Sequence, residues 1–255
     1  MLPDFQRISS REKLILAGLY LSKYDSLGLK KLGFESFQEA FNVIGYGLGF
    51  ETGFNKKLIG MNLIRYSQIN DKAGTNGQDA NTVLRFTKNI KDLDLETFSA
   101  LLKSFVDYDE NALSVIESRE EKKDGESFFA KRLITGLAAE HYFEEIQPKL
   151  PEFKNYILEN TTRLGCGYDF RLARKSDDKF LAVEVKGLQD RTGSLALTPK
   201  EYEMASSLSE RFYLFVVKNF RELPVHDIYC NPLSSSLKFT RKERVVVQIS
   251  WSATI

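Results

Sequence analysis

The sequence GYDFRLARKSDDKFLAVEVKGL, residues 167–188, decides the fold of this chain. It contains two apolar runs with the period of a β-strand, separated by the polar tetrapeptide KSDD, and this pattern predicts an antiparallel hairpin. The second run is apolar on both faces in its first half, so we expect that strand to be covered on both sides. Its second half carries Glu184 and Lys186 on one face, and these two charges need an explanation.

The simplest register of the hairpin places a third charged residue beside this pair. If Arg174 lies opposite Lys179 across the turn, Asp169 lies opposite Glu184, with Cβ atoms about 5 Å apart. Two carboxylates at that distance repel each other, and burial increases the cost, so a positive charge must lie between them. Lys186 is one candidate. A divalent cation such as Mg²⁺, which binds carboxylate and phosphate oxygens together, is the better one.

A further acid lies on the helix that is predicted over residues 126–146, just before the hairpin. At about 100° per residue, Glu140 projects on the apolar side of this helix, beside Leu133 and Leu137. Burying a carboxylate there costs free energy unless a cation or a hydrogen-bond donor pairs with it, which favours a third acid at the same site. The alternative is that Glu140 lies at the margin of the apolar stripe and reaches water.

Other segments carry clear signals of secondary structure. Ser9 with Glu12, and Thr198 with Glu201, form capping boxes that predict helix starts, and this structural role is sufficient to explain Glu201. Amphipathic periodicity and apolar runs predict helices over residues 36–48, 54–66 and 93–106, and strands over residues 212–217 and 244–251.

The net charge of +1 hides an uneven distribution. Residues 55–91 carry seven bases and two acids, whereas residues 92–127 carry eleven acids and four bases. A basic segment of this kind indicates contact with a polyanion at one place, and the alternative is an ordinary solvated face. The change of sign, together with the polar stretch 118–128, favours a boundary between domains 1–117 and 118–255.

The predicted helices 36–48 and 54–66 are joined by a short glycine-bearing turn and have the shape of a helix-turn-helix. Plain helical packing is the alternative. Lysines near the second helix would contact phosphates, and amides there and in the following stretch would bond base edges, unless that stretch is an ordinary exposed loop. The candidate DNA-binding residues are Asn55, Lys56, Lys57, Asn62, Arg65, Lys72, Asn76 and Gln78.

An acid on a helix followed by an Asp and a Glu-x-Lys on neighbouring strands resembles the pattern of the PD-(D/E)XK nucleases, with Tyr168 in place of the proline. More narrowly, the segments GLAAEHYF, GYDFRL, FLAVEVKGL, LTPKEYEMA and YLFVV resemble the NO VEIN C-terminal-like domains. These domains are a nuclease-related branch often found in restriction and defence proteins. The resemblance runs over residues 136–232, which is most of the C-terminal half.

This resemblance implies roles for four residues. Asp169 and Glu184 would hold a metal ion, Glu140 would assist through water or a second ion, and Lys186 would position the attacking water. The chemistry agrees, because phosphodiester hydrolysis at neutral pH needs a nucleophilic hydroxide and a counter-charge for the transition state.

We therefore expect an α/β chain, with a helical DNA-reading region followed by a restriction-endonuclease-like mixed sheet that is flanked by helices. The expected function is that of a Mg²⁺-dependent DNA endonuclease, most plausibly a type II restriction enzyme that reads a short site in double-stranded DNA. Its host would then carry a cognate methyltransferase, and a homodimer is one assembly that suits the function. The alternatives are a catalytically silent nucleic-acid-binding or defence module on the same fold, and a nuclease for modified or structured DNA.

Composition excludes several other classes. The chain has two cysteines and two histidines without chelating spacing, which argues against a structural zinc site. No apolar run is long enough to cross a bilayer, and the first residues lack the pattern of a signal peptide, so we expect a cytoplasmic protein.

Overall fold

The computed structural model of the 255-residue chain describes residues 8–50, 93–103, 105, 125–175 and 177–243. Among the described residues before 106, the helices are α1 (Ser10–Lys31), α2 (Phe37–Gly47) and α5 (Leu95–Lys103). Between residues 125 and 243, the structure describes the long helix α7 (Gly125–Ile146), the shorter helix α8 (Pro199–Leu208) and five strands. These strands are β1 (Ile157–Asn160), β2 (Phe170–Arg174), β3 (Asp177–Gly187), β4 (Phe212–Lys218) and β5 (Val225–Cys230).

The five strands form one mixed sheet in the order β1-β2-β3-β4-β5. The pairs β1–β2, β2–β3 and β4–β5 are antiparallel, whereas β3 and β4 run parallel. A parallel pair needs a crossover connection, and α8 lies in the connection between these two strands. The expected α/β fold, with a helical N-terminal region and a mixed sheet flanked by helices, is confirmed.

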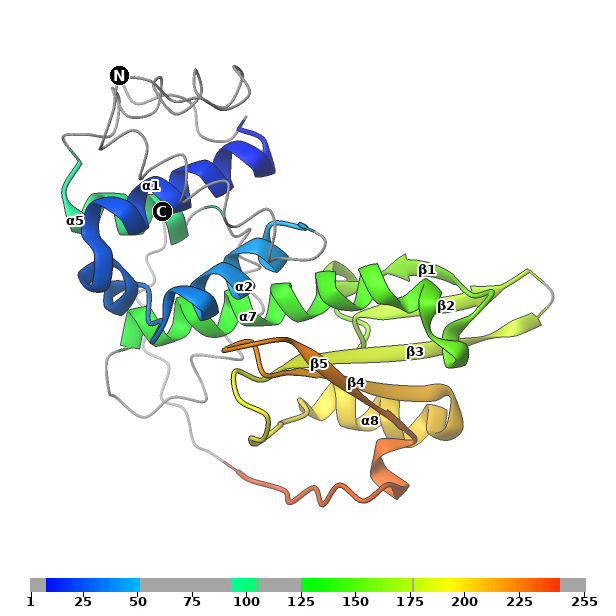
Figure 1. The fold of residues 1–255 in the computed structure, drawn as a ribbon. Coiled ribbons are helices and arrows are strands. Elements are labelled where there is room, and N and C mark those ends of the chain that lie inside the picture. Colours follow the sequence, from blue (N-terminus) through cyan, green and yellow to red (C-terminus); the bar gives the residue numbers. More distant parts are fainter. Residues whose placement is uncertain (1–7, 51–92, 104, 106–124, 176, 244–255) are drawn as a thin grey trace, which may run out of the picture.

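Helices cover both faces of the sheet, as the apolar first half of β3 predicts (Figure 1). Val183 and Val185 pack into the large core on the side of α7, whereas Ala182 packs with Ala205 of α8 and Phe212 in a smaller core on the opposite face. Alternate residues of β3 therefore serve two separate cores, which explains why this strand shows little polar alternation.

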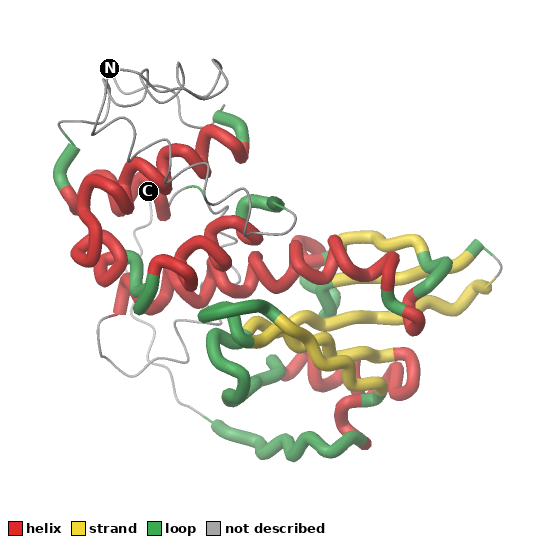
Figure 2. The backbone as a smooth tube through the Cα atoms, in the orientation of Figure 1, coloured by secondary structure: helices red, strands yellow, loops and turns green. Residues whose placement is uncertain are grey.

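The helical region packs against α7 through α2, and Figure 2 shows α1 and α2 above α7 in the view of Figure 1. Residues of α1, α2, α5 and α7 share one apolar core with the α7 face of the sheet. The buried amide of Asn42 in α2 donates to the carbonyl oxygens of Phe220 and Glu222, both at 2.7 Å, in the loop that follows β4. In the same loop, Arg221 forms an ion pair of 2.7 Å with Glu35.

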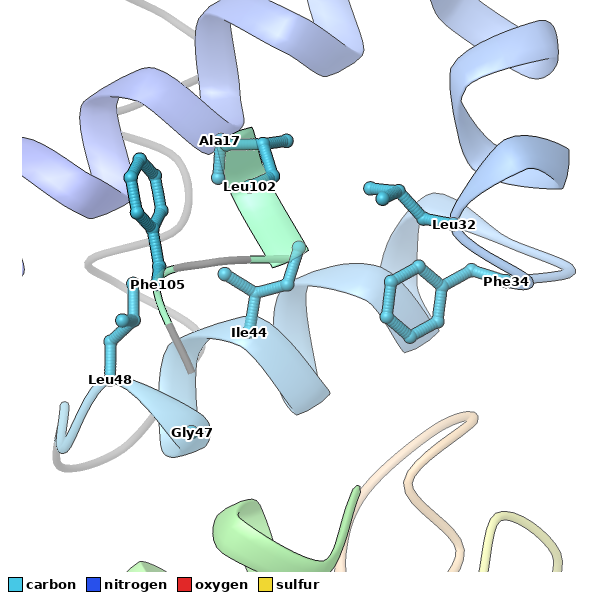
Figure 3. A pocket seen from close by; sticks show the side chains of 8 residues that line it. All are labelled: Ala17, Leu32, Phe34, Ile44, Gly47, Leu48, Leu102 and Phe105. Carbon is cyan, nitrogen blue, oxygen red and sulfur yellow. The ribbon is translucent and has the colours of Figure 1, made fainter. Parts of the chain in front are cut away.

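A small apolar cavity of about 30 Å³ lies between α1, α2 and α5 (Figure 3). The part of its lining that the structure describes is apolar and includes no titratable side chain. The lining residues are Ala17, Leu32, Phe34, Ile44, Gly47, Leu48, Leu102 and Phe105. The cavity therefore lies within the apolar packing of these helices.

The described helices agree with their sequence signals in most places. Both predicted capping boxes are present, at Ser9 with Glu12 and at Thr198 with Glu201. The helix predicted over residues 93–106 is shorter and spans Leu95–Lys103. The helix predicted over residues 54–66, the strand over residues 244–251 and the proposed boundary near residue 118 lie outside the described residues.

Candidate active site

The β2–β3 hairpin has the register that brings Asp169 to Glu184. The pairs Leu172–Leu181 and Phe170–Val183 are both present, so Asp169 lies just beyond the last pair and level with Glu184. The expected closing pair of the turn is wrong, because Arg174 pairs with Asp177 rather than with Lys179. A bulge between Ala173 and Arg174 absorbs this difference, and the register beyond it is unchanged.

Hydrogen bonds to both neighbouring strands fix the backbone and carboxylate of Asp169. Its backbone N–H donates to Val183 at 3.0 Å, and its carbonyl oxygen accepts from the N–H of Thr161 at 2.8 Å. Its Oδ2 accepts the backbone N–H of Val185 at 2.8 Å. The carboxylate therefore lies against β3 between the positions of Glu184 and Lys186, in an orientation set by the backbone.

The ammonium of Lys186 lies between two carboxylates. Its Nζ donates to Oε1 of Glu184 and, at 3.0 Å, to Oε2 of Glu201. The side chain of Glu184 is 3 % exposed and that of Lys186 is 21 % exposed. This is a partly buried ion cluster with limited access from solvent, and buried charges of this kind are costly unless they are paired.

Glu201 is the residue of this cluster that the sequence did not reveal. It lies at the N-terminal end of α8, where its Oε2 accepts the backbone N–H of Thr198 at 2.9 Å as part of the capping box. The same oxygen accepts from Lys186. The capping motif accounts for Glu201 completely at the level of sequence, so only the packing of α8 beneath β3 shows its second contact.

Two glycines allow the helices to approach the site closely. A Cβ on Gly187 would lie 2.7 Å from the carbonyl oxygen of Thr135, so the absence of a side chain lets α7 pack against the end of β3. Gly167 has φ +91°, and a Cβ there would lie 2.7 Å from Cγ of Met204 in α8. The start of β2 and the start of α8 are therefore held together next to Asp169.

Glu140 lies on α7, near enough to Asp169 for their charges to interact. Burial, and then the charge of Asp169, raise the pKa of Glu140 to about 8. The charge of Glu144 on the same helix raises it further, and that carboxylate also accepts from Nδ1 of His141 at 2.9 Å if this nitrogen carries the proton. The side chain of Glu140 is half-buried, so it is neither fully solvated nor enclosed in the core.

The electrostatics of the cluster show an excess of carboxylates. Burial raises the pKa of Asp169 to about 6, although Lys186 acts in the opposite direction. Burial and the neighbouring Asp169 raise the pKa of Glu184 well above its usual range. The surrounding carboxylates, Glu184 first, hold the pKa of Lys186 above its ordinary value despite burial. At neutral pH this lysine is therefore an ammonium, whereas the raised pKa values of Glu140 and Glu184 shift these two carboxyl groups toward their protonated forms.

The donor set fits a hard divalent cation. Asp169 and Glu184 offer carboxylate oxygens, which Mg²⁺ and Ca²⁺ prefer, and Mg²⁺ usually takes only one or two protein carboxylates and keeps several waters. Among the described residues, no three side chains of His, Cys, Asp or Glu lie close enough together to hold a metal ion. A cation would thus be held by the two strand carboxylates, with Glu140 nearby.

The raised pKa values predict how stability depends on pH in the metal-free protein. Since the pKa of Glu140 is about 8 in the fold and the ordinary pKa of a glutamate is 4.5, the folded state binds more protons than the unfolded state between these two pH values. The free energy of unfolding should therefore fall as pH rises from about 4.5 to about 8. Allowing for its partial exposure, we expect Glu140 to contribute on the order of 1–2 kcal/mol to this fall.

Urea denaturation in EDTA at pH 5 and pH 8 measures this effect. Glu140→Gln cannot ionise, so its stability should change less between the two pH values than that of the unmodified chain. Equal changes in both proteins would contradict the electrostatic origin that we assign to this pKa.

The eight candidate DNA-binding residues, from Asn55 to Gln78, lie outside the described residues. Cys166 and Cys230 are both free. Within the described ranges, no helix is long and apolar enough to cross a membrane.

Comparison with known protein families gives a match in the C-terminal half. Residues 137–229 match the family described as Protein NO VEIN, C-terminal, which is a nuclease-like domain family. No curated protein and no solved structure matches the chain significantly. The matched segment extends from α7 through β5 and contains Glu140, Asp169, Glu184, Lys186 and Glu201. Over this segment the chain is similar to a nuclease-like family.

Proposed function

We propose that this chain is a Mg²⁺-dependent DNA endonuclease that hydrolyses phosphodiester bonds, a restriction-type enzyme that reads a short site in double-stranded DNA. The observation that carries the proposal is the cluster of Asp169, Glu184 and Lys186, which the β2–β3 register assembles at one end of a covered strand. The similarity of residues 137–229 to a nuclease-like family supports it.

Each side chain of the cluster has a role that follows from its charge. Asp169 and Glu184 would hold the divalent cation, which when bound lowers the pKa of a coordinated water and offsets the charge of the phosphate. Lys186 is cationic at neutral pH, so it serves as an electrostatic partner of a phosphate oxygen and not as a general base. Glu140, with its pKa of about 8, can exchange a proton near pH 7.

Binding of DNA is assigned to the basic segment 55–91, which carries seven bases and two acids. Lysines of this segment would position the duplex through phosphates, and its amides would read base edges. A restriction enzyme also needs a cognate methyltransferase in its host, and a homodimer would match a palindromic site. The methyltransferase and the second copy of the chain are both part of what we propose.

A second candidate is a catalytically silent nucleic-acid-binding module on the same fold. One observation favours it: Lys186 already lies between Glu184 and Glu201, so the cluster is partly neutralised without any added cation. A structural ion cluster of this kind would need neither a metal nor a scissile phosphate.

Incubation of the full chain with unmethylated plasmid and Mg²⁺ separates the two candidates. The proposal predicts cleavage that requires Mg²⁺ and is abolished by EDTA, with discrete fragments on a gel if a short site is read. A smear would show a nuclease without sequence specificity. Intact plasmid, together with a mobility shift of the same DNA, would favour the silent module.

A further inference from the structure

The position of Lys186 raises the question of what happens to its ammonium when a cation arrives. Glu184 is the more buried of the two carboxylates that it contacts, at 3 % against 15 % exposure for the side chain of Glu201. Glu184 is also the carboxylate assigned to the metal. The ammonium and a divalent cation therefore compete for the same oxygen atoms, since Oε1 of Glu184 is the acceptor of Lys186.

We propose that Lys186 is an internal competitor of the divalent cation at Glu184, and that Glu201 is a positioning residue that retains the ammonium beside the site after the cation displaces it. The inference rests on the proposed function and concerns the regulation of that same site. Glu201 suits this role because its Oε2 lies 3.0 Å from Nζ of Lys186. The lysine can thus give up one carboxylate and keep the other.

The capping box fixes Glu201 for this purpose. Its carboxylate accepts the backbone N–H of Thr198, and the hydroxyl of Thr198 accepts the backbone N–H of Glu201 at 3.2 Å. The first turn of α8 is therefore held in one conformation, and the carboxylate that faces Lys186 is held with it. Burial raises the pKa of Glu201, but the charge of Lys186 and the capping hydrogen bond outweigh it, so the pKa lies below its usual range and the carboxylate is ionised at neutral pH.

Calorimetric titration with Ca²⁺, in the absence of DNA, tests the first part without reference to activity. Lys186→Met removes the ammonium and keeps most of the side-chain volume, so Glu184 becomes available. We expect the Kd for Ca²⁺ to fall about 10-fold relative to the unmodified chain, because a close unit charge no longer opposes the cation. An unchanged or weaker affinity of Lys186→Met would overturn the competition.

Glu201→Gln tests the second part, because glutamine still closes a capping box but has no charge to hold the ammonium. Lys186 should then remain on Glu184, and Ca²⁺ should bind several-fold more weakly. Thr198→Ala is the matched control: it removes the hydroxyl that accepts the N–H of Glu201 but keeps the backbone N–H of residue 198 that holds the charged carboxylate, so it should weaken Ca²⁺ binding much less than Glu201→Gln. If Thr198→Ala loses as much affinity as Glu201→Gln, Glu201 acts only as a helix cap, and the positioning role is wrong.

A double-mutant cycle separates an effect through Lys186 from a direct effect of the charge of Glu201. In the Lys186→Met background, Glu201→Gln should no longer weaken Ca²⁺ binding, and persistence of the full effect would overturn the positioning role. If the unmodified chain cleaves DNA but the Ca²⁺ affinities of all variants are equal, only this inference fails. If the unmodified chain neither binds Ca²⁺ nor cleaves DNA, the proposed function fails with it.

Discussion

Replacing Lys186 with Met is expected to reduce the rate of DNA cleavage by about 10²–10³-fold, the usual effect of removing one group that stabilises transition-state charge. Affinity for DNA should stay within about tenfold, because this ammonium acts mainly on the charge that develops at the phosphate. Glu184→Gln should have the larger effect and abolish cleavage, since it removes a carboxylate that would hold the cation. Single-turnover cleavage and a filter-binding titration in Ca²⁺ measure the two quantities separately.

Lys149→Met is the matched control for this prediction. It removes the same charge from a side chain that is 70 % exposed and pairs only with Glu145 at 3.6 Å among the ion pairs described. Exposed pairs of this kind contribute little, so cleavage should be unchanged. The catalytic assignment of the cluster is wrong if Lys186→Met cuts DNA as fast as this control.

Replacing Phe143 with Ala should have the largest effect on stability. Phe143 is fully buried on α7, and its ring lies 5.1 Å from that of Phe170 on β2 and 4.8 Å from that of Phe215 on β4. Its removal would leave a cavity between the helix and the sheet, for which the expected loss is about 3–5 kcal/mol. Urea denaturation, followed by circular dichroism, measures this loss.

Two further variants make the stability prediction specific. Phe143→Leu keeps much of the volume and should lose less than the alanine variant, because the remaining cavity is smaller. Leu164→Ala alters a side chain that is 70 % exposed, so its free energy of unfolding should change by less than about 0.5 kcal/mol. A loss for Phe143→Ala no larger than that for Leu164→Ala would show that α7 does not depend on this contact.

The β2–β3 hairpin shows how much of the candidate site can be predicted from local sequence. The period of two in residues 179–188 separates Val183 and Val185 from Glu184 and Lys186, and the structure keeps these faces apart. The register follows from the same pattern, since a slip of one residue would exchange the faces of the strand. The bulge at Arg174 was not visible in the sequence, because a polar turn of this length can close in more than one way.

The edge strands were also missed by the sequence patterns. β1 has only four residues, three of them exposed, and β5 is half-buried along most of its length. Neither shows a clear alternation, because an edge strand packs against neighbours on fewer sides than a central strand. Their places follow from pairing with β2 and β4, which is a tertiary contact.

The sequence by itself determined that Asp169, Glu184 and Lys186 would come together, because all three belong to one hairpin whose register is local. Only the tertiary structure decided that Glu201 joins them, since its contact with Lys186 spans two elements and depends on how α8 crosses the sheet. The same holds for Asn42, whose amide bonds the loop after β4 across the molecule. Periodicity describes one element at a time, whereas the distance between side chains of different elements is set by the packing of their cores.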